Sequence, residues 1–297
     1  MVSAVRHLLT RWDARARLLP RLALVALLAG VLVSAACAGS ASKSEAVPSG
    51  ASYDQTTLAL DPVLYLGMRP GSATEEPDLS HHLPAGTYSP EGVNRASARL
   101  PNGQAATVFD GSSWLRLQSS PILSISHAGA LTIEAWVNPA TLRFARAESS
   151  GYVQWLGKGA SSAYEYVLRM YSLGNSEGRD NRISGYAFNL SGGKGSGAYF
   201  QDHVHVGAWI MIAVEFDTTP SAGFPSGWVA IFKDGALRQM VGLDQFGVVP
   251  RPGSAPFTVG TVTGRSFFQG SIAKVAVFDR VLPTSDIVTQ YHAMVGQ

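Results

Sequence analysis

Two stretches of the chain, residues 164–182 and 186–205, carry aromatic side chains together with Asn, Asp and Arg. This combination suits sugar recognition, because an aromatic ring stacks on the apolar face of a pyranose while amides, carboxylates and guanidinium groups bind its hydroxyls. The core of a folded domain also needs aromatic residues, so the polar loop at residues 175–182 is the stronger candidate. The residues that we expect to bind a ligand are Asn175, Arg179, Asp180, Asn181, Arg182 and Tyr199.

A second polar cluster consists of Asp202, His203 and His205. Residues two apart in an extended segment point to the same side, so both imidazoles could face one metal ion. A solvated loop explains them equally well, and no third ligand lies in register. Nearby, S-G-G-K-G-S-G (191–197) lacks the phosphate-loop pattern and no helix follows it, so we interpret it as a flexible connection between strands.

The elements that must position these residues are strands. In L-T-I-E-A-W-V (131–137), the odd-numbered residues point one way, and Thr132, Glu134 and Trp136 point the other. Further strands are expected at residues 105–109, 114–117, 152–156, 164–171, 183–190, 209–217, 227–233, 236–240, 257–260 and 271–278. So many short strands with hardly a helix indicate an all-β fold, a sandwich or jelly roll.

Two local patterns predict specific elements, a hairpin turn and a C-terminal helix. Asp234-Gly235 tolerates the positive φ angles of a type I′ turn, so it predicts a tight hairpin between its flanking strands. After Pro283, residues 287, 288, 291 and 294 share one face of a short C-terminal helix, with Thr284 or Ser285 as its expected cap.

The first 36 residues have the pattern of an export signal. Five arginines and one acid precede an apolar run from Leu22 to Ala36, and Cys37 follows. Such a run is shorter than the about 20 residues that a membrane-spanning helix needs. Cys37 resembles the cysteine of a bacterial lipobox, which receives a diacylglyceryl group and becomes the new N-terminus. Ser34 stands where that motif usually has Leu or Val, so an ordinary signal peptide and an uncleaved anchor stay open as alternatives.

Removal of this signal changes the charge of the chain. All 297 residues include 23 basic and 21 acidic ones, a formal net charge of +2, and the pI is near 8.7. Without the five arginines and one acid of the signal, 18 basic residues face 20 acidic ones, a charge of about −2. The basic pI therefore describes the signal, and we expect no nucleic-acid partner.

The chain divides into three parts: a lipoprotein signal peptide (1–36), a flexible tether (37–52) and one β-sandwich domain (53–297). Small polar residues make up the tether, which as a random coil reaches roughly 20 Å. Over the whole chain, the apolar content of 46% excludes a wholly disordered protein, and the single cysteine excludes an intrachain disulfide. We expect a lipid-anchored protein at the cell membrane that faces the extracytoplasmic side, because the arginines stay inside.

An ordered series of motifs resembles a LamG-like domain of the concanavalin A-like lectin/glucanase superfamily. The matching segments are P-V-L-Y-L (62–66), V-F-D-G-S-S-W-L-R-L (108–117), L-T-I-E-A-W-V-N-P (131–139), G-A-W-I-M-I-A-V-E-F-D (207–217), V-A-I-F-K-D-G (229–235) and the closing segment 267–287. The resemblance covers nearly all of residues 53–295. It implies a jelly-roll β-sandwich of two antiparallel sheets with a short C-terminal helix.

The chain departs from the family pattern at two places. Ala273-Lys274 stands where the family usually has Asp-Glu, and Ile210-Met211 stands where histidines are common. Some relatives bind a structural calcium ion, for which the oxygen donors here are Asp180, Asn181 and Asp202. The loss of an acid at position 273 weakens that implication.

The resemblance also carries a test for catalysis. Retaining glucanases of the superfamily use Glu-x-Asp-x-Glu, which places three carboxylates on one face of a strand. The nearest approach here is Glu215-x-Asp217-x-Thr219, in which Thr219 cannot replace the acid/base. We therefore expect a non-catalytic module that binds a glycan or a surface protein. The alternatives are a diverged glycoside hydrolase or lyase and an envelope scaffold or adhesion protein.

Overall fold

The computed structural model describes residues 52–89 and 95–297. The expected signal peptide, Cys37 and all of the tether before Ser52 lie outside these residues. Ser52 itself forms the N-cap of helix α1 (Tyr53–Leu58), where its side chain and that of Gln55 each accept a hydrogen bond from the other residue's backbone N–H. In the described part of the chain, no helix is both long enough and apolar enough to span a membrane.

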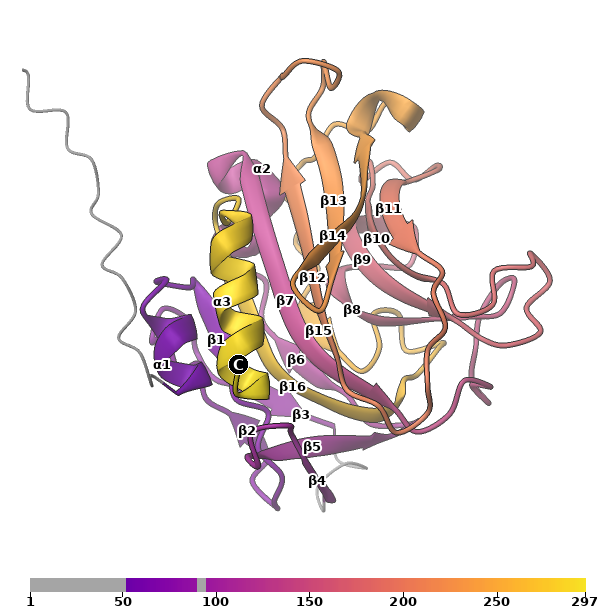
Figure 1. Cartoon of the computed structure of the whole chain (residues 1–297). Coiled ribbons are helices and arrows are strands. Elements are labelled where there is room, and N and C mark those ends of the chain that lie inside the picture. Colours follow the sequence, from indigo (N-terminus) through magenta and orange to yellow (C-terminus); the bar gives the residue numbers. More distant parts are fainter. Residues whose placement is uncertain (1–51, 90–94) are drawn as a thin grey trace, which may run out of the picture. The chain divides into compact units, whose positions relative to one another are not determined.

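The described residues form two antiparallel sheets of eight strands each (Figure 1), which confirms the two-sheet fold that the family resemblance implies. Sheet I has the order β14-β13-β12-β7-β16-β5-β4, with β1 paired to β16. Its strands are β1 (Leu64–Leu66), β4 (Ser97–Arg99), β5 (Ala105–Asp110), β7 (Ala130–Pro139), β12 (Ile210–Asp217), β13 (Trp228–Lys233), β14 (Ala236–Gly242) and β16 (Gln269–Phe278).

Sheet II has the order β11-β10-β9-β8-β15-β6-β3-β2. Its strands are β2 (Glu75–Glu76), β3 (Gly86–Tyr88), β6 (Leu115–Leu117), β8 (Tyr152–Ala160), β9 (Ala163–Tyr171), β10 (Ile183–Ala187), β11 (Ser196–Phe200) and β15 (Phe257–Val259). The helical elements besides α1 are η2 (Pro121–Leu123), α2 (Ile125–Ala128), η3 (Leu243–Phe246) and α3 (Thr284–Val295).

The core lies between the inner faces of the two sheets. Tyr166 of sheet II packs on Phe216 of sheet I with ring centroids 5.7 Å apart. The sheets approach so closely at Gly185 that an added Cβ would come within 2.5 Å of Cγ1 of Val214. Each sheet therefore has a second face that points away from the core, on which a binding site can form.

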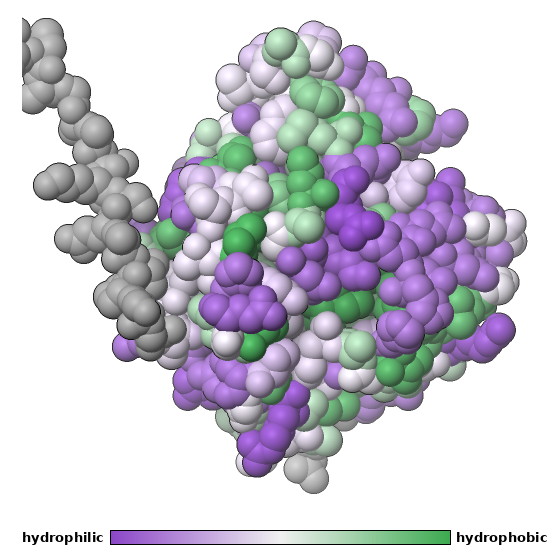
Figure 2. Space-filling view, viewed as in Figure 1, coloured by the Kyte–Doolittle hydropathy of each residue, from purple (hydrophilic) through white to green (hydrophobic). Residues whose placement is uncertain are grey.

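The outer face of sheet I is covered by helices. Trp136 on β7 stacks on Tyr291 of α3, with centroids 5.9 Å apart, and meets Tyr53 of α1 edge-on at 6.3 Å. Glu134 lies on the same face and is fully buried. Where α3 crosses this side, the surface shows hydrophobic residues scattered among hydrophilic ones (Figure 2). The outer face of sheet I is thus closed to ligands at this place.

The structure confirms the predictions made from local patterns, and it also contains short strands that the sequence did not predict. The hairpin is confirmed, with φ of 52° at Asp234 and 80° at Gly235. The C-terminal helix is confirmed too, but its N-cap is Pro283, and neither Thr284 nor Ser285 caps it. Strands β2, β3 and β4 have only two or three residues, too few to show an alternating pattern.

Candidate binding site

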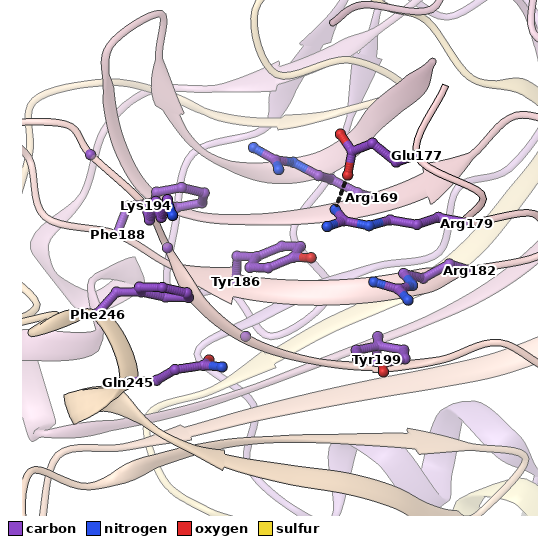
Figure 3. Close-up of a pocket in the computed structure, with 13 residues that line it drawn as sticks. Arg169, Glu177, Arg179, Arg182, Tyr186, Phe188, Lys194, Tyr199, Gln245 and Phe246 are labelled. Atoms are coloured by element: carbon purple, nitrogen blue, oxygen red, sulfur yellow. Dashed lines mark ion pairs between the residues drawn. The ribbon is translucent and has the colours of Figure 1, made fainter. Parts of the chain in front are cut away.

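A groove of about 510 Å³ opens on the outer face of sheet II, around β9, β10 and β11 (Figure 3). The residues that line it are Arg169, Glu177, Arg179, Arg182, Tyr186, Phe188, Gly193, Lys194, Gly195, Gly197, Tyr199, Gln245 and Phe246. They come from three neighbouring strands, the loops around them and η3. The volume lies in the range typical of small-molecule and cofactor sites.

Strand alternation explains why these side chains point into the groove. On β9, the alternate residues Tyr166, Leu168 and Met170 belong to the core. Arg169, between the last two, therefore points outward. The ladder then pairs Arg169 with Ser184 on β10, and Ser184 with Tyr199 on β11. Residues paired in this way share one face of the sheet, so a row of outward side chains crosses three strands.

The glycine-rich segment 191–197 is part of the groove. A Cβ at Gly197 would come within 2.3 Å of Cδ1 of Tyr186, and one at Gly195 within 2.6 Å of Cε1 of Phe188. Glycine is required here because the two rings lie directly against the backbone. The prediction of a mere connection was incomplete, since Ser196 begins β11. Glycine is uncommon in strands, so the glycine-rich composition of this segment concealed the start of β11.

The groove is strongly cationic. Arg169, Arg179, Arg182 and Lys194 line it against one acid, Glu177. Cationic side chains stand at both ends of the groove, with Tyr186 between them, in Figure 3. Such a concentration of one sign inside a concave site focuses the field and favours a negatively charged ligand.

Two of the predicted ligand residues are held firmly at one end of the groove. Arg179 forms an ion pair with Glu177 and donates from Nη1 to the Tyr171 hydroxyl at 2.9 Å. Arg182 donates two hydrogen bonds to Oε1 of Gln201, at 3.1 and 2.9 Å. Its guanidinium carbon lies 3.8 Å from the ring centroid of Tyr199, the third predicted residue that lines the groove.

Asn175 and Asp180 have a different role, because their side chains bond within the loop before β10. Oδ1 of Asp180 accepts from the Gly174 backbone N–H at 2.8 Å and from Nδ2 of Asn175 at 3.0 Å. Oδ1 of Asn175 accepts from the backbone N–H of Glu177 and of Arg179. Neither residue lines the groove. They position Glu177 and Arg179, which do.

Two of the three expected calcium donors, Asp180 and Asp202, already have partners within the fold. The carboxylate of Asp202 is already paired, with Nη2 of Arg238 at 2.6 Å and with Nζ of Lys233 at 3.4 Å. Asn181 adopts a φ of 61°, and its Oδ1 is buried without a hydrogen-bond partner. Within the described residues, no group of three or more His, Cys, Asp or Glu side chains is placed to hold a metal ion.

The two histidines near Asp202 face each other. The rings of His203 and His205 meet edge-on with centroids 4.2 Å apart. Both precede β12 in a segment without strand pairing, as the solvated-loop interpretation expects. Val204 between them turns inward and is buried.

Glu215, at the acidic strand end, is buried and hydrogen-bonded within the fold. Glu215 is 2% exposed on the outer face of sheet I, and its Oε1 accepts from the Leu282 backbone N–H at 3.1 Å. Oδ1 of Asp217 accepts from the Thr219 backbone N–H at 2.7 Å, as in a turn. The groove lies on the opposite side of the sandwich, where Glu177 is the one lining carboxylate among the described residues.

Sequence reasoning missed several groove residues. Arg169, Phe188, Lys194, Gln245 and Phe246 line the groove but were not among the expected ligand residues. Phe246 is 44% exposed, one of few large hydrophobic side chains so open among the described residues. Its place in η3 after β14 could not be connected with β9 or β10 from the sequence, because the link is made across the fold.

Solved structures with similar folds include domain 4 of AbnA, a GH43 extracellular arabinanase from Geobacillus stearothermophilus, in complex with arabinotriose. It is 16% identical, with a TM-score of 0.51, and the match covers 78% of this chain and 98% of that one. The botulinum neurotoxin serotype D ligand binding domain in complex with N-acetylneuraminic acid is 10% identical, with a TM-score of 0.55 and coverage of 80% and 52%.

A third similar structure is the binding domain of botulinum neurotoxin DC in complex with rat synaptotagmin II, 9% identical with a TM-score of 0.53. That match covers 79% of this chain and 52% of the neurotoxin domain, so this chain spans about half the length of the toxin domains it resembles. No curated protein matches the chain in sequence. The family model described as the concanavalin A-like lectin/glucanases superfamily matches residues 109–288, more than half of the chain. The chain therefore belongs to the concanavalin A-like lectin/glucanases superfamily.

Proposed function

We propose that this protein is a non-catalytic glycan-binding module, held on the extracytoplasmic side of the membrane by a lipid on Cys37. One observation carries the proposal: the groove on the outer face of sheet II combines ring faces with hydrogen-bonding side chains. Tyr186, Phe188, Tyr199 and Phe246 supply the aromatic surface on which sugar rings stack. Arginine, lysine and glutamine side chains around them supply donors for hydroxyl groups.

The shape and construction of the groove fit an oligosaccharide. The groove is open to the surface rather than enclosed, so a sugar chain can reach the side chains that line it. The glycines of β11 hold the rings of Tyr186 and Phe188 close to the backbone, which limits their motion before a ligand binds. Such preorganisation lowers the entropy that binding must overcome. Similar folds solved with arabinotriose and with N-acetylneuraminic acid lend support to a sugar as the ligand class.

A glycan array tests the proposal, with a chain that begins at Ala38 and so keeps every described residue. The wild type should bind at least one glycan, and Tyr186→Ala should weaken that binding by about tenfold through the loss of a stacking face. Trp114→Ala is the matched control, because Trp114 is an aromatic residue next to β6 of the same sheet and does not line the groove. Absence of binding to every glycan would contradict the proposal and favour a protein partner.

Membrane attachment has its own test. Cys37→Ser in the full chain removes the thiol that a diacylglyceryl group requires. The variant should leave the membrane fraction, whereas the wild type should stay with it until detergent is added. If both proteins fractionate alike, the lipid anchor is refuted, and the glycan-binding proposal is unaffected.

A further inference from the structure

Arg169 occupies an unusual position in the groove. It is half-buried on β9, and its guanidinium carbon lies 4.3 Å from the ring centroid of Tyr152, 5.0 Å from that of Tyr186 and 5.4 Å from that of Phe188. Three aromatic rings therefore hold the cation in place. Aromatic rings interact with the charge and occupy none of its N–H donors, so the donors of the guanidinium stay available.

Those donors have no hydrogen-bond partner among the residues that the structure describes. Among the described residues, Arg169 forms neither an ion pair nor a hydrogen bond, and its Nε is buried without a partner. Its ladder neighbours Gln154 and Ser184 share the same face of sheet II and are at most 1% exposed. Their Oε1 and Oγ atoms also lack a partner. Buried polar groups without partners are rare because they cost free energy, and a bound ligand is one way to satisfy them.

The other cations of the groove are engaged to different degrees. Arg179 is neutralised by Glu177. Arg182 hydrogen-bonds to the neutral amide of Gln201, and Lys194 lies 5.5 Å from the ring centroid of Phe246. With four cationic side chains against one acid, the groove keeps a positive charge that a neutral sugar would leave uncompensated.

We propose that the groove selects acidic glycans, with the carboxylate of a hexuronate bound by the guanidinium of Arg169 while its sugar ring stacks on Tyr186. The inference rests on the proposed glycan-binding function and names the class of glycan. A carboxylate matches the planar fork of an arginine, which can donate to both of its oxygens. In a hexuronate the carboxylate is bonded directly to the sugar ring, so the groups that bind the ring and the carboxylate must be neighbours. Tyr186 and Arg169 meet this requirement, because the guanidinium carbon lies 5.0 Å from the ring centroid.

Calorimetric titration of the chain from Ala38 onward tests this inference with paired ligands. The acidic probes are tetragalacturonate and a tetramannuronate, each compared with its neutral methyl ester, and a heparin-derived tetrasaccharide, compared with its desulfated form, which keeps its carboxylates. At least one uronate should bind about tenfold or more tightly than its methyl ester, the gain expected for charge-assisted hydrogen bonds. A larger effect for the heparin probe than for both uronates would place a sulfate at Arg169 and overturn the assignment of a carboxylate. The ligand pairs need no variant, so this comparison does not depend on whether a substituted protein folds.

Substitutions then test whether Arg169 supplies the positive charge that binds the acidic ligand. Arg169→Gln should reduce affinity for the acidic probe by about tenfold or more while affinity for its neutral form changes little. Arg169→Lys keeps the charge and loses the planar fork, so its affinity for the acidic probe should lie between those of the wild type and of Arg169→Gln. Arg116→Gln is the matched control: Arg116 also points outward from sheet II, over the ring of Trp114 at 4.4 Å, but lies outside the groove. Thermal unfolding of each variant checks that it is folded.

The failures of the two proposals can be told apart. Equal affinity for the acidic and neutral forms would overturn the acidic-glycan inference and leave glycan binding intact. No binding to any probe, together with an empty glycan array, would end the proposed function itself. Equal binding of inorganic polyphosphate, weakened alike by Arg169→Gln and Arg116→Gln, would reveal unspecific attraction to polyanions and would also overturn the inference.

Discussion

Gln290 on α3 donates a hydrogen bond from Nε2 to Oε1 of Glu134 on β7, at 2.9 Å across the interface between helix and sheet. The second oxygen of Glu134 is buried without a partner. Burial raises the pKa of Glu134 to about 8 against the lowering effect of this hydrogen bond, and the charge of Glu215 raises it further. Burial likewise raises the pKa of Glu215 to about 7. Folding thus favours the neutral form of two carboxyl groups on sheet I.

These carboxyl groups predict a pH-dependent stability. Below the ordinary pKa of 4.5, Glu134 is protonated in both the folded and the unfolded chain. As pH rises from there through about 8, the unfolded chain ionises first, so the free energy of unfolding should fall. Glu134→Gln removes this contribution and should stabilise the protein by about 1–3 kcal/mol above that range, since the amide has no charge to bury.

Urea unfolding as a function of pH measures the effect. The exposed Glu75→Gln is the control, because Glu75 lies at the surface on β2. The same slope with pH in wild type and Glu134→Gln would show that Glu134 does not contribute.

The pair of Lys274 and Asp54 predicts an unequal response to substitution. Lys274 takes the place of an expected family acid, has a φ of 56°, and is buried, with Nζ 2.5 Å from Oδ1 of Asp54 on α1. Asp54→Asn leaves a buried ammonium without its counter-charge and should destabilise the protein by about 3–5 kcal/mol.

Lys274→Met should cost less, because Asp54 keeps its hydrogen bonds from the Tyr65 hydroxyl and from Nε2 of Gln104. As the control, Arg265→Gln breaks the ion pair to Glu148 at a side chain that is 60% exposed, and should cost less than about 1 kcal/mol. Chemical denaturation gives all three values. Equal costs for Asp54→Asn and Arg265→Gln would show that the buried pair is not stabilising.

The β13–β14 hairpin predicts a strict requirement for glycine. Gly235 has a φ of 80°, and its Cβ would also lie 3.4 Å from Cα of Val288 on α3. Gly235→Ala should destabilise the domain by about 1–2 kcal/mol because a side chain disfavours this left-handed conformation. Gly67→Ala is the control, because Gly67 lacks a positive φ and its Cβ would make ordinary contact with Leu79. A cost no larger than that of Gly67→Ala in guanidinium unfolding would contradict the turn geometry.

The paired state of Asp202 predicts that calcium does not stabilise the domain. Lys233 and Arg238 already compensate its carboxylate, so a cation would have to displace them. The unfolding temperature should therefore be the same in calcium and in EDTA. A calcium-dependent increase that Asp202→Asn abolishes would instead establish the ion that the family resemblance suggests.

The sequence alone determined the local elements of this protein. Alternation along residues 131–137 predicted β7, Asp234-Gly235 predicted the hairpin, and the face that contains Ile287 and Met294 predicted α3. These features depend on side chains within a few residues of each other, so a single chain segment carries them. Arg179, Arg182 and Tyr199 were predicted as ligand residues for the same reason, because their polar and aromatic neighbours stand beside them in the sequence.

Which outer face is open depends on how the elements pack against each other. Glu134 and Trp136 alternate with core residues as solvent-facing ones would, yet α3 buries them. The groove joins Arg169 to Lys194 and to Phe246, which come from a strand, a loop and a 3₁₀ helix. Their proximity follows from the pairing of β9, β10 and β11 and from the return of the chain after β14. Strand pairing joins residues that are distant along the chain, so alternation within each strand shows which side a residue faces but not which residues stand beside it.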